Sequence, residues 1–389
     1  MSGLAAVVAV VQFLFGTTWT LYVIYLPQLA ASAGVGREWV PWILVADQLV
    51  EANLTGHDSH GVGLVPFYVH SLAAGALVPN RHAEVVHRQG AVLVIEGRRG
   101  YGQVIGHEAM ELGMAGAREQ GVAVLAIRNS FHLGRIGHWA EQCAGAGFAS
   151  IHFVNGIDHP PIQAPFGAAE ARLSTNPFCA ALPGPDGPMV VLDMATSKIA
   201  LGKARVAANR GVPTPEGSLL DADGLPTRNA AVMFQEPKGA LVAMGEHKGS
   251  GLAILCELLA GALTGGWTIE PGHPMAGGTL NNMLSVIIDP DALGGREQLW
   301  REGGALLSYL KSARPLAGVA EVLVPGEPEQ HRRRQRSASG IEIDERSWAD
   351  ILAAARTAGV PDAEIDTLLA WSAGQSQTRV EAWNGSTAS

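Results

Sequence analysis

One short run in this 389-residue chain groups the side chains best suited to proton chemistry. Gly56-His57-Asp58-Ser59-His60-Gly61 holds two histidines, a carboxylate and a hydroxyl. Burying such a cluster costs solvation free energy and adds nothing to an apolar core, which favours a functional role. The pKa of histidine is near neutrality, so it can protonate a carbonyl oxygen as hydride arrives at the carbon. Asp58 or Ser59 can orient the imidazole; the rival interpretation is a turn capped by these two residues.

Two other loops carry the residue types of a ligand site. Asn129-Ser130-Phe131-His132-Leu133-Gly134-Arg135-Ile136-Gly137 lies between an expected strand and an expected helix, where backbone N–H groups attract anions such as pyrophosphate. Glu246-His247-Lys248-Gly249-Ser250-Gly251 opens a long helix. A lysine at a helix start opposes the helix dipole unless it serves a ligand, so Lys248 is a candidate contact. An ordinary strand–helix loop remains the alternative for the first segment.

Two alternative chemistries have weaker support. His57, Asp58 and His60, with His132 or His247, could ligate a metal ion in a hydrolase, but no HExxH or comparable second motif accompanies them. We therefore expect no metal. The run Gly100–Gly106 is off by one from the GxGxxG spacing of a Rossmann fold. No suitably placed acidic residue follows it for the ribose contact, so that fold is not predicted.

Alternating strands and helices must position these segments. Residues 39–53 have apolar residues at helical spacing. Residues 250–264 are apolar enough to predict a helix buried on most faces. The other expected strands are 92–96, 122–128, 149–154, 189–194 and 283–288, and the other expected helices are 107–119, 137–147, 297–311 and 346–369. The alternation predicts an α/β protein with its sheet covered by helices.

Composition narrows the class of protein. Apolar residues make up 47% and charged residues 16% of the chain, which is ample material for a core. A net charge of −9 argues against a nucleic-acid partner, and the basic run 331–336 is interpreted as a solvated helix face. Cys143, Cys179 and Cys256 form no CxxC pair, so buried free thiols in the reducing cytoplasm are expected.

The N-terminus differs from the rest of the chain. No charged residue precedes Arg37, and residues 4–23 are almost continuously apolar over a bilayer-spanning length. The positively charged start of a secretory signal is missing. A membrane anchor, a buried or interface helix, and an extension unrelated to the core are the three possibilities. Association with a membrane through this stretch is possible but not favoured.

Taken together, several ordered segments resemble the malate/L-lactate/L-sulfolactate dehydrogenase-like family, which is distinct from the Rossmann-type lactate and malate dehydrogenases. The resemblance covers all but the N-terminal stretch and the tail. The matching segments are LVADQLVEANLTGHDSHGVG (44–63), HEAMELG (107–113), HLGRIGHWAEQCAGAGF (132–148), STNPFC (174–179), LDMATSKIALGK (192–203), GEHKG (245–249), LNNM (280–283) and VPGE (324–327).

The resemblance implies a fold and an activity. The fold is a non-Rossmann malate/L-sulfolactate dehydrogenase-like α/β fold, with a mixed sheet covered by helices and a helical subdomain from both chain ends. It implies a helical subdomain from 31–85 plus 295–371 and a cofactor-binding domain over 86–294. It also implies a homodimer that transfers hydride between NAD or NADP and a 2-oxo acid/2-hydroxy acid of the lactate, malate, glycerate or aryl-lactate type. The residue pattern itself predicts an apolar extension over residues 1–30 and a flexible tail over 372–389.

The resemblance also assigns roles to individual residues. Ser59 and His60 are the implied catalytic pair, and Thr175 and Arg135 are the implied substrate contacts. The implied cofactor contacts are His60, His132, Gly134, Arg135, Ile136, Leu192, Asp193, Met194, Ala195, His247, Lys248, Asn281, Pro325, Gly326 and Glu327.

Three positions depart from the family pattern. Many members carry an arginine four residues after the catalytic histidine to clamp the substrate carboxylate, and Leu64 stands there. Lys203 stands where some members have an aspartate, and Ser174 replaces a usual glycine. Arg135, Arg172 or Lys248 could replace the missing arginine, so the sequence leaves the substrate open.

Overall fold

A seven-stranded mixed sheet forms the centre of the computed structural model, which describes residues 40–367 and 369. Its strands, in spatial order, are β1 (Glu84–Gln89), β2 (Val92–Glu96), β3 (Val122–Phe131), β10 (Leu280–Ile288), β4 (Ala149–Ile157), β5 (Phe178–Gly184) and β6 (Gly187–Met194). β2 and β3 pair in parallel, and the other neighbours are antiparallel. The mixed α/β fold is confirmed. The expected extension over residues 1–30 and tail over 372–389 lie outside the described residues.

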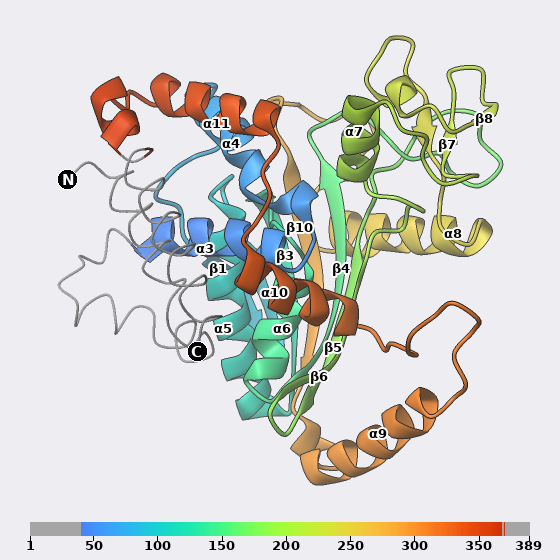
Figure 1. The fold of residues 1–389 in the computed structure, drawn as a ribbon. Coiled ribbons are helices and arrows are strands. Elements are labelled where there is room, and N and C mark those ends of the chain that lie inside the picture. Colours follow the sequence, from blue (N-terminus) through green and yellow to red (C-terminus); the bar gives the residue numbers. More distant parts are fainter. Residues whose placement is uncertain (1–39, 368, 370–389) are drawn as a thin grey trace, which may run out of the picture.

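Helices cover both faces of this sheet (Figure 1). α5 (Gly102–Gln120) packs on β3, and α6 (Gly137–Gly145) packs on β4, β5 and β6. On the other face, the π-helix η5 (Glu257–Ala262), which continues α8 (His247–Cys256), contacts β4 and β10. Val154 belongs to the core under α5 and α6, whereas the next residue, Asn155, bonds to Glu257 of η5. Adjacent strand residues point to opposite faces, so the two helical layers lie on opposite sides.

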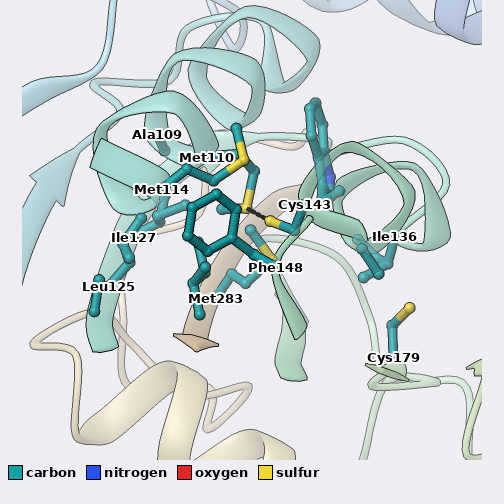
Figure 2. Close-up of a cluster of buried hydrophobic side chains, with 14 of the residues drawn as sticks. Ala109, Met110, Met114, Leu125, Ile127, Ile136, Cys143, Phe148, Cys179 and Met283 are labelled. Atoms are coloured by element: carbon teal, nitrogen blue, oxygen red, sulfur yellow. Dashed lines mark hydrogen bonds between the residues drawn. The ribbon is translucent and has the colours of Figure 1, made fainter. Parts of the chain in front are cut away.

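The main core lies between the sheet and the α5–α6 layer (Figure 2). Met110 and Met114 of α5 meet Ile127 of β3 and Met283 of β10 there, all of them buried. Cys143 of α6 contacts the Met110 sulfur at 3.7 Å. All three cysteines are buried and free, as expected from their spacing.

The two ends of the described chain meet beside the core. α11 (Glu345–Thr357) packs on α4 (Val65–Ala73), and α10 (Glu327–Ser339) packs on α3 (Val40–Leu54) (Figure 1). The remaining elements are α7 (Leu201–Arg210), α9 (Arg296–Lys311), the small sheet β8 (Pro226–Thr227), β7 (Leu219–Leu220) and β9 (Ala240–Leu241), and the short helices η2 (Asp58–His60), η3 (Val62–Leu64), η4 (Ala230–Met233) and η6 (Pro290–Ala292).

Two sequence predictions about helices were wrong. The segment 250–264 is helical, but it is not buried on most faces: Leu255, Leu258 and Leu263 are 51%, 51% and 68% exposed. The expected helix 346–369 is interrupted, because α11 ends at Thr357 and Gly359 adopts a left-handed φ of +82°. Within residues 40–367 and 369, no helix has the length and apolar character needed to cross a bilayer.

Candidate active site

The turn that carries the two histidines follows directly from the end of α3. The Thr55 hydroxyl donates to the Glu51 carbonyl oxygen at 2.8 Å, and Gly56 takes a left-handed φ of +86° that reverses the chain. The amide of Asn53 then holds both sides of the turn: Nδ2 donates to Asp58 at 2.7 Å, and Oδ1 accepts from Val62 N–H at 2.8 Å. Asp58 is therefore held by side chains instead of capping η2, which has no side-chain cap.

Side chains of α10 hold this turn and the end of α3 in place through hydrogen bonds and ion pairs. Arg336 bonds both carboxylate oxygens of Asp58, at 2.6 and 3.0 Å, and Arg333 bonds Glu51 at 2.8 Å. Glu329 lies 3.6 Å from His57 Nε2. Burial raises the pKa of Asp58, but the hydrogen bonds from Arg336 and Asn53 outweigh it and leave that pKa below its usual value. The basic run was interpreted as a solvated helix face; Arg332 and Arg334 are exposed, but Arg333 and Arg336 bond inward to Glu51 and Asp58.

The imidazole of His60 lies edge to edge with that of His132. Nδ1 of His60 is 3.2 Å from Nε2 of His132, the ring planes differ by 11° and the ring centroids are 5.3 Å apart. Nε2 of His60 makes no hydrogen bond within the described part of the chain. Burial, followed by the charges of His57 and Arg135, lowers the pKa of His60 to about 4, against an opposing effect of Asp193. His60 is therefore neutral at pH 7.

Ser59 is held against the first turn of α7. A Cβ added to Gly202 would lie 2.2 Å from the Ser59 Cβ, so only glycine permits this approach. The contact joins the catalytic turn to the segment that follows β6. Lys203, at a position where some family members have an aspartate, comes next on the same helix.

A buried charge cluster lies near His60. The Arg135 side chain contacts Glu141 and lies 3.6 Å from Asp193, and both Arg135 and Asp193 influence the pKa of His60. Arg135 Nη1 and Asp193 Oδ2 form this ion pair at 3.6 Å without a hydrogen bond, and Arg135 Nε is also buried without a hydrogen-bond partner in the described residues. A bound group with both donors and acceptors would supply these hydrogen bonds, and a nicotinamide nucleotide offers both. The residues therefore fit such a cofactor.

Other predicted cofactor residues shape this region through the backbone. Asn281 accepts from Leu133 N–H at 2.8 Å, which fixes the loop between β3 and α6. Gly134 in that loop has a left-handed φ of +72°. Pro325 accepts from Val191 N–H of β6 at 3.1 Å, beside Gly326. The other predicted residues of these segments are Ile136 in the core, Leu192 and Met194 on β6, Ala195 after it, and Glu327, which pairs with Lys311.

The structure does not bring every predicted residue to His60. His247 and Lys248 are exposed at the start of α8, where His247 packs against Phe166 at 5.9 Å between ring centroids. Arg172 is exposed and pairs with Glu170. The Thr175 carbonyl accepts from the Thr196 hydroxyl at 2.8 Å, and the Thr175 hydroxyl makes no hydrogen bond within the described residues.

Leu64, in place of the family arginine, packs against the core around Tyr68 and Phe131. The substrate-clamping position is therefore apolar. Metal ligation has no support either: among the described residues, no group of three His, Cys, Asp or Glu side chains could hold a metal ion. Asp58 faces Arg336 and His57 faces Glu329 instead.

Sequence reasoning missed several residues around His60. Tyr68 on α4 bonds to His132, Gln103 on α5 donates to Tyr68, and Gly202 and Arg336 position the turn. Gln103 lies inside the Gly100–Gly106 run, and the sequence alone indicated no role for the glycines of that run. In the structure they serve packing: a Cβ on Gly102 would lie 2.1 Å from the His132 carbonyl oxygen.

Known proteins are similar to this chain in sequence and in fold. A family model described as malate/L-lactate dehydrogenase matches residues 42–352. Hydroxycarboxylate dehydrogenase B of Escherichia coli O157:H7 is 47% identical over 321 residues, which cover 82% of this chain and 88% of that protein. L-lactate dehydrogenase of Cupriavidus necator is 42% identical over 322 residues, covering 82% and 92%. A solved E. coli structure described as a malate/lactate dehydrogenase has a TM-score of 0.82 at 41% identity, covering 95% of this chain and 97% of that one.

Proposed function

The chain belongs to the malate/L-lactate dehydrogenase family and is a 2-hydroxy acid oxidoreductase, and we propose that it uses NAD or NADP with His60 as its acid/base. The observation that carries this proposal is the pairing of His60 with His132. Because Nδ1 of His60 faces His132, Nε2 is the nitrogen left to exchange a proton with a substrate oxygen. A histidine in this role contributes ~10²–10⁴-fold to the rate.

The proton steps follow from the position of His60. In the reducing direction, Nε2 donates its proton to the oxygen of the 2-oxo acid as the carbonyl carbon is reduced. In the oxidising direction, neutral His60 that carries its own proton on Nδ1 accepts the hydroxyl proton at Nε2. Ser59, held between His60 and α7, orients the substrate beside it.

The nicotinamide nucleotide, when bound, supplies or takes up the hydride. We assign its binding to the residues around the charge cluster, where Arg135 and Asp193 form an ion pair but leave buried polar atoms without a hydrogen bond. The loop at His132 and Gly134, the β6 end from Leu192 to Ala195, and Asn281 complete this group. His247, Lys248 and the Pro325–Glu327 turn are assigned to its more distant parts.

The chain lacks the arginine with which many family members bind the substrate carboxylate, so another group must bind that carboxylate here. Arg135 is 4% exposed and has two carboxylates within salt-bridge distance, so its charge is already balanced. We therefore assign Arg135 mainly to orienting Asp193 and propose that the Thr175 hydroxyl contacts the substrate. The apolar Leu64 favours 2-oxo acids with an uncharged side chain over dicarboxylates.

We further propose a homodimer in the cytoplasm. The exposed leucines 255, 258 and 263 form an apolar stripe on α8 and η5, of the kind that marks protein interfaces. Leu255→Glu should shift the mass in light scattering from dimer to monomer, while a wild-type monomer would contradict the assignment. The reducing cytoplasm suits three buried, unpaired thiols.

A direct experiment tests the activity. Purified protein is screened by thermal shift with NAD, NADP and their reduced forms. A panel of 2-oxo acids is then followed at the absorbance of the reduced nucleotide. We expect stabilisation by one nucleotide pair and turnover of a 2-oxo acid with an uncharged side chain. Absence of turnover with every 2-oxo acid, despite nucleotide binding, would remove the proposal.

A further inference from the structure

A line of uncharged hydrogen-bonding groups extends behind His60 into the protein. The Tyr68 hydroxyl lies 2.8 Å from Nδ1 of His132, and Nε2 of Gln103 donates to the Tyr68 oxygen at 2.7 Å. Tyr68 is 4% exposed and Gln103 is 1% exposed. The line therefore joins α4, α5, the loop after β3 and the catalytic turn.

Both ring nitrogens of His132 face a hydrogen-bond partner. Its Nε2 faces His60 and its Nδ1 faces Tyr68. Since the ring planes of His60 and His132 differ by 11° and their centroids lie farther apart than the two nitrogens, the rings meet edge to edge, as a hydrogen bond requires. A neutral imidazole has one donor and one acceptor nitrogen, so the proton on His132 determines the direction of the whole line.

We propose that Tyr68 and Gln103, acting through His132, are positioning residues that set which nitrogen of His60 carries its proton. This inference rests on the proposed function of His60 as the acid/base. Neither residue touches the substrate in this proposal. Their effect is on the tautomer and the protonation of the imidazole that does.

The line can run in two directions because the Gln103 amide has a donor end and an acceptor end. With Nε2 donating to Tyr68, Tyr68 donates to His132 Nδ1, and His132 Nε2–H donates to His60 Nδ1. Neutral His60 then carries its proton on Nε2 and cannot accept another one there, so this is the resting direction. It is the direction that the Gln103–Tyr68 bond gives in the structure. The neutral form that accepts a proton at Nε2 carries its own proton on Nδ1 and needs the reverse direction.

Doubly protonated His60 requires the reverse direction. Its Nδ1–H donates to His132 Nε2, His132 Nδ1–H donates to the Tyr68 oxygen, and the Tyr68 hydroxyl donates to Oε1 of Gln103. That oxygen is buried without a hydrogen-bond partner in the described residues, so an acceptor is available. When Nε2 of His60 gives its proton to the substrate oxygen, one proton leaves the line and the others stay in place.

The electrostatics keep the positive charge on His60. Burial lowers the pKa of His132 to about 3, and it raises the pKa of Tyr68 far above its usual value. His132 and Tyr68 therefore both stay neutral while they pass on the orientation of the hydrogen bonds. A buried neutral network of this kind is stable only when every member finds a partner, which is why each residue in it matters.

The test is ¹⁵N NMR of the His60 ring in the nucleotide-free protein, followed by the pH profile of reduction. In the wild type we expect a single tautomer of neutral His60. Tyr68→Phe should give a mixture of tautomers. Gln103→Glu supplies a permanent acceptor, so it should raise the pKa of His60 and move the reduction profile toward alkaline pH by about one unit, a roughly tenfold effect on the protonated fraction.

A matched control is available in Tyr101→Phe. Tyr101 packs edge to face on Tyr68 at 6.1 Å between ring centroids, and it makes no side-chain hydrogen bond within the described residues. The control should leave both the tautomer and the pH profile unchanged. A wild-type mixture of tautomers, or a His60 signal that is the same in wild type, Tyr68→Phe and Gln103→Glu, would overturn the proposal.

The NMR measurement separates this inference from the proposed function. If His60→Ala retained full turnover while the His60 tautomer still responded to Tyr68 and Gln103, the acid/base role would fail and the line would stand. If Tyr68→Phe did not fold, the wild-type tautomer and the Gln103→Glu profile would still decide.

Discussion

Arg336 and Asp58 lie 278 positions apart in the chain and form a two-bond pair, with Nη1–Oδ1 at 2.6 Å and Nη2–Oδ2 at 3.0 Å. The same guanidinium donates to the carbonyl oxygen of Asn53. Helix α10 therefore fixes the turn that carries His60 at the Asp58 carboxylate, and it fixes the end of α3 at the Asn53 carbonyl. Bidentate arginine–carboxylate pairs combine strength with a defined orientation.

Arg336→Met should loosen the catalytic turn. We expect a loss of about 1–2 kcal/mol in the free energy of unfolding, because the pair is partly exposed and its net contribution is modest. Turnover should fall more than the nucleotide affinity. Urea unfolding and steady-state kinetics measure the two effects. Arg334→Met, on an exposed residue of the same helix, is the control and should change neither.

His60→Ala should reduce turnover by ~10²–10⁴-fold, because it removes the group that exchanges the substrate proton. Nucleotide affinity, followed by fluorescence titration, should change little. His57→Ala is the paired variant: His57 faces Glu329, so its loss should leave most of the turnover. Near-wild-type turnover of the His60 variant would contradict the assignment.

The pH dependence should differ between the two directions. Burial lowers the pKa of His60 to about 4 in the free protein, so the protonated acid is a minor form at pH 7. Above that pKa, kcat/KM for reduction should fall about tenfold per pH unit, while oxidation should reach a plateau. Asp193→Asn should move both profiles toward acid, because Asp193 raises the pKa of His60. Identical profiles in both directions would be inconsistent with a His60 acid/base.

Gly202→Ala should displace Ser59, since the new Cβ would lie 2.2 Å from the Ser59 Cβ. Packed interiors do not absorb such an overlap without movement, so we expect turnover to fall at least about tenfold. Gly251→Ala on α8 is the control, because an added Cβ there meets nothing within 4 Å. Equal kinetics for the two variants would show that the α7 contact does not position Ser59.

The protein should lose stability in mild acid. Burial lowers the pKa of His132, His138 and His152 to about 3, below the ordinary value of 6.5. In this range the unfolded chain binds more protons than the folded one, so stability is present above pH 6.5 and is lost as the pH falls toward 3. The urea midpoint should drop between pH 7 and pH 4.5. His152→Asn should make the drop in the urea midpoint smaller. A wild-type midpoint that stayed the same between pH 7 and pH 4.5 would refute the predicted acid sensitivity.

Asp47 and Glu51 have the opposite effect on the pH dependence of stability. Burial raises the pKa of both to about 7, so their stabilising neutral forms are lost as the pH rises through 7. Asp47→Asn should therefore raise the urea midpoint at pH 8 more than at pH 5. Equal shifts at the two pH values would show that Asp47 is ionised throughout.

Much of the fold and the outline of the site could be predicted from the sequence. Strand and helix periodicities are local, so β2, β3 and α6 were placed within a few residues of their positions. The free cysteines and the turn containing His60 were also evident from residue type and spacing. β1, by contrast, is an exposed strand without polar–apolar alternation, so it was not predicted.

The partners of the site residues depended on the tertiary structure. Arg336 meets Asp58, and Tyr68 and Gln103 meet His132, only because α10, α4 and α5 fold onto one turn. Sequence periodicity shows which face of a helix is apolar but not what covers it, which is why the exposed leucines of α8 and η5 were expected to be buried. The sequence thus singled out a histidine turn as the candidate for the acid/base chemistry. Only the packing of distant helices decided which groups hold its proton, because hydrogen-bond partners far apart in the chain leave no local pattern.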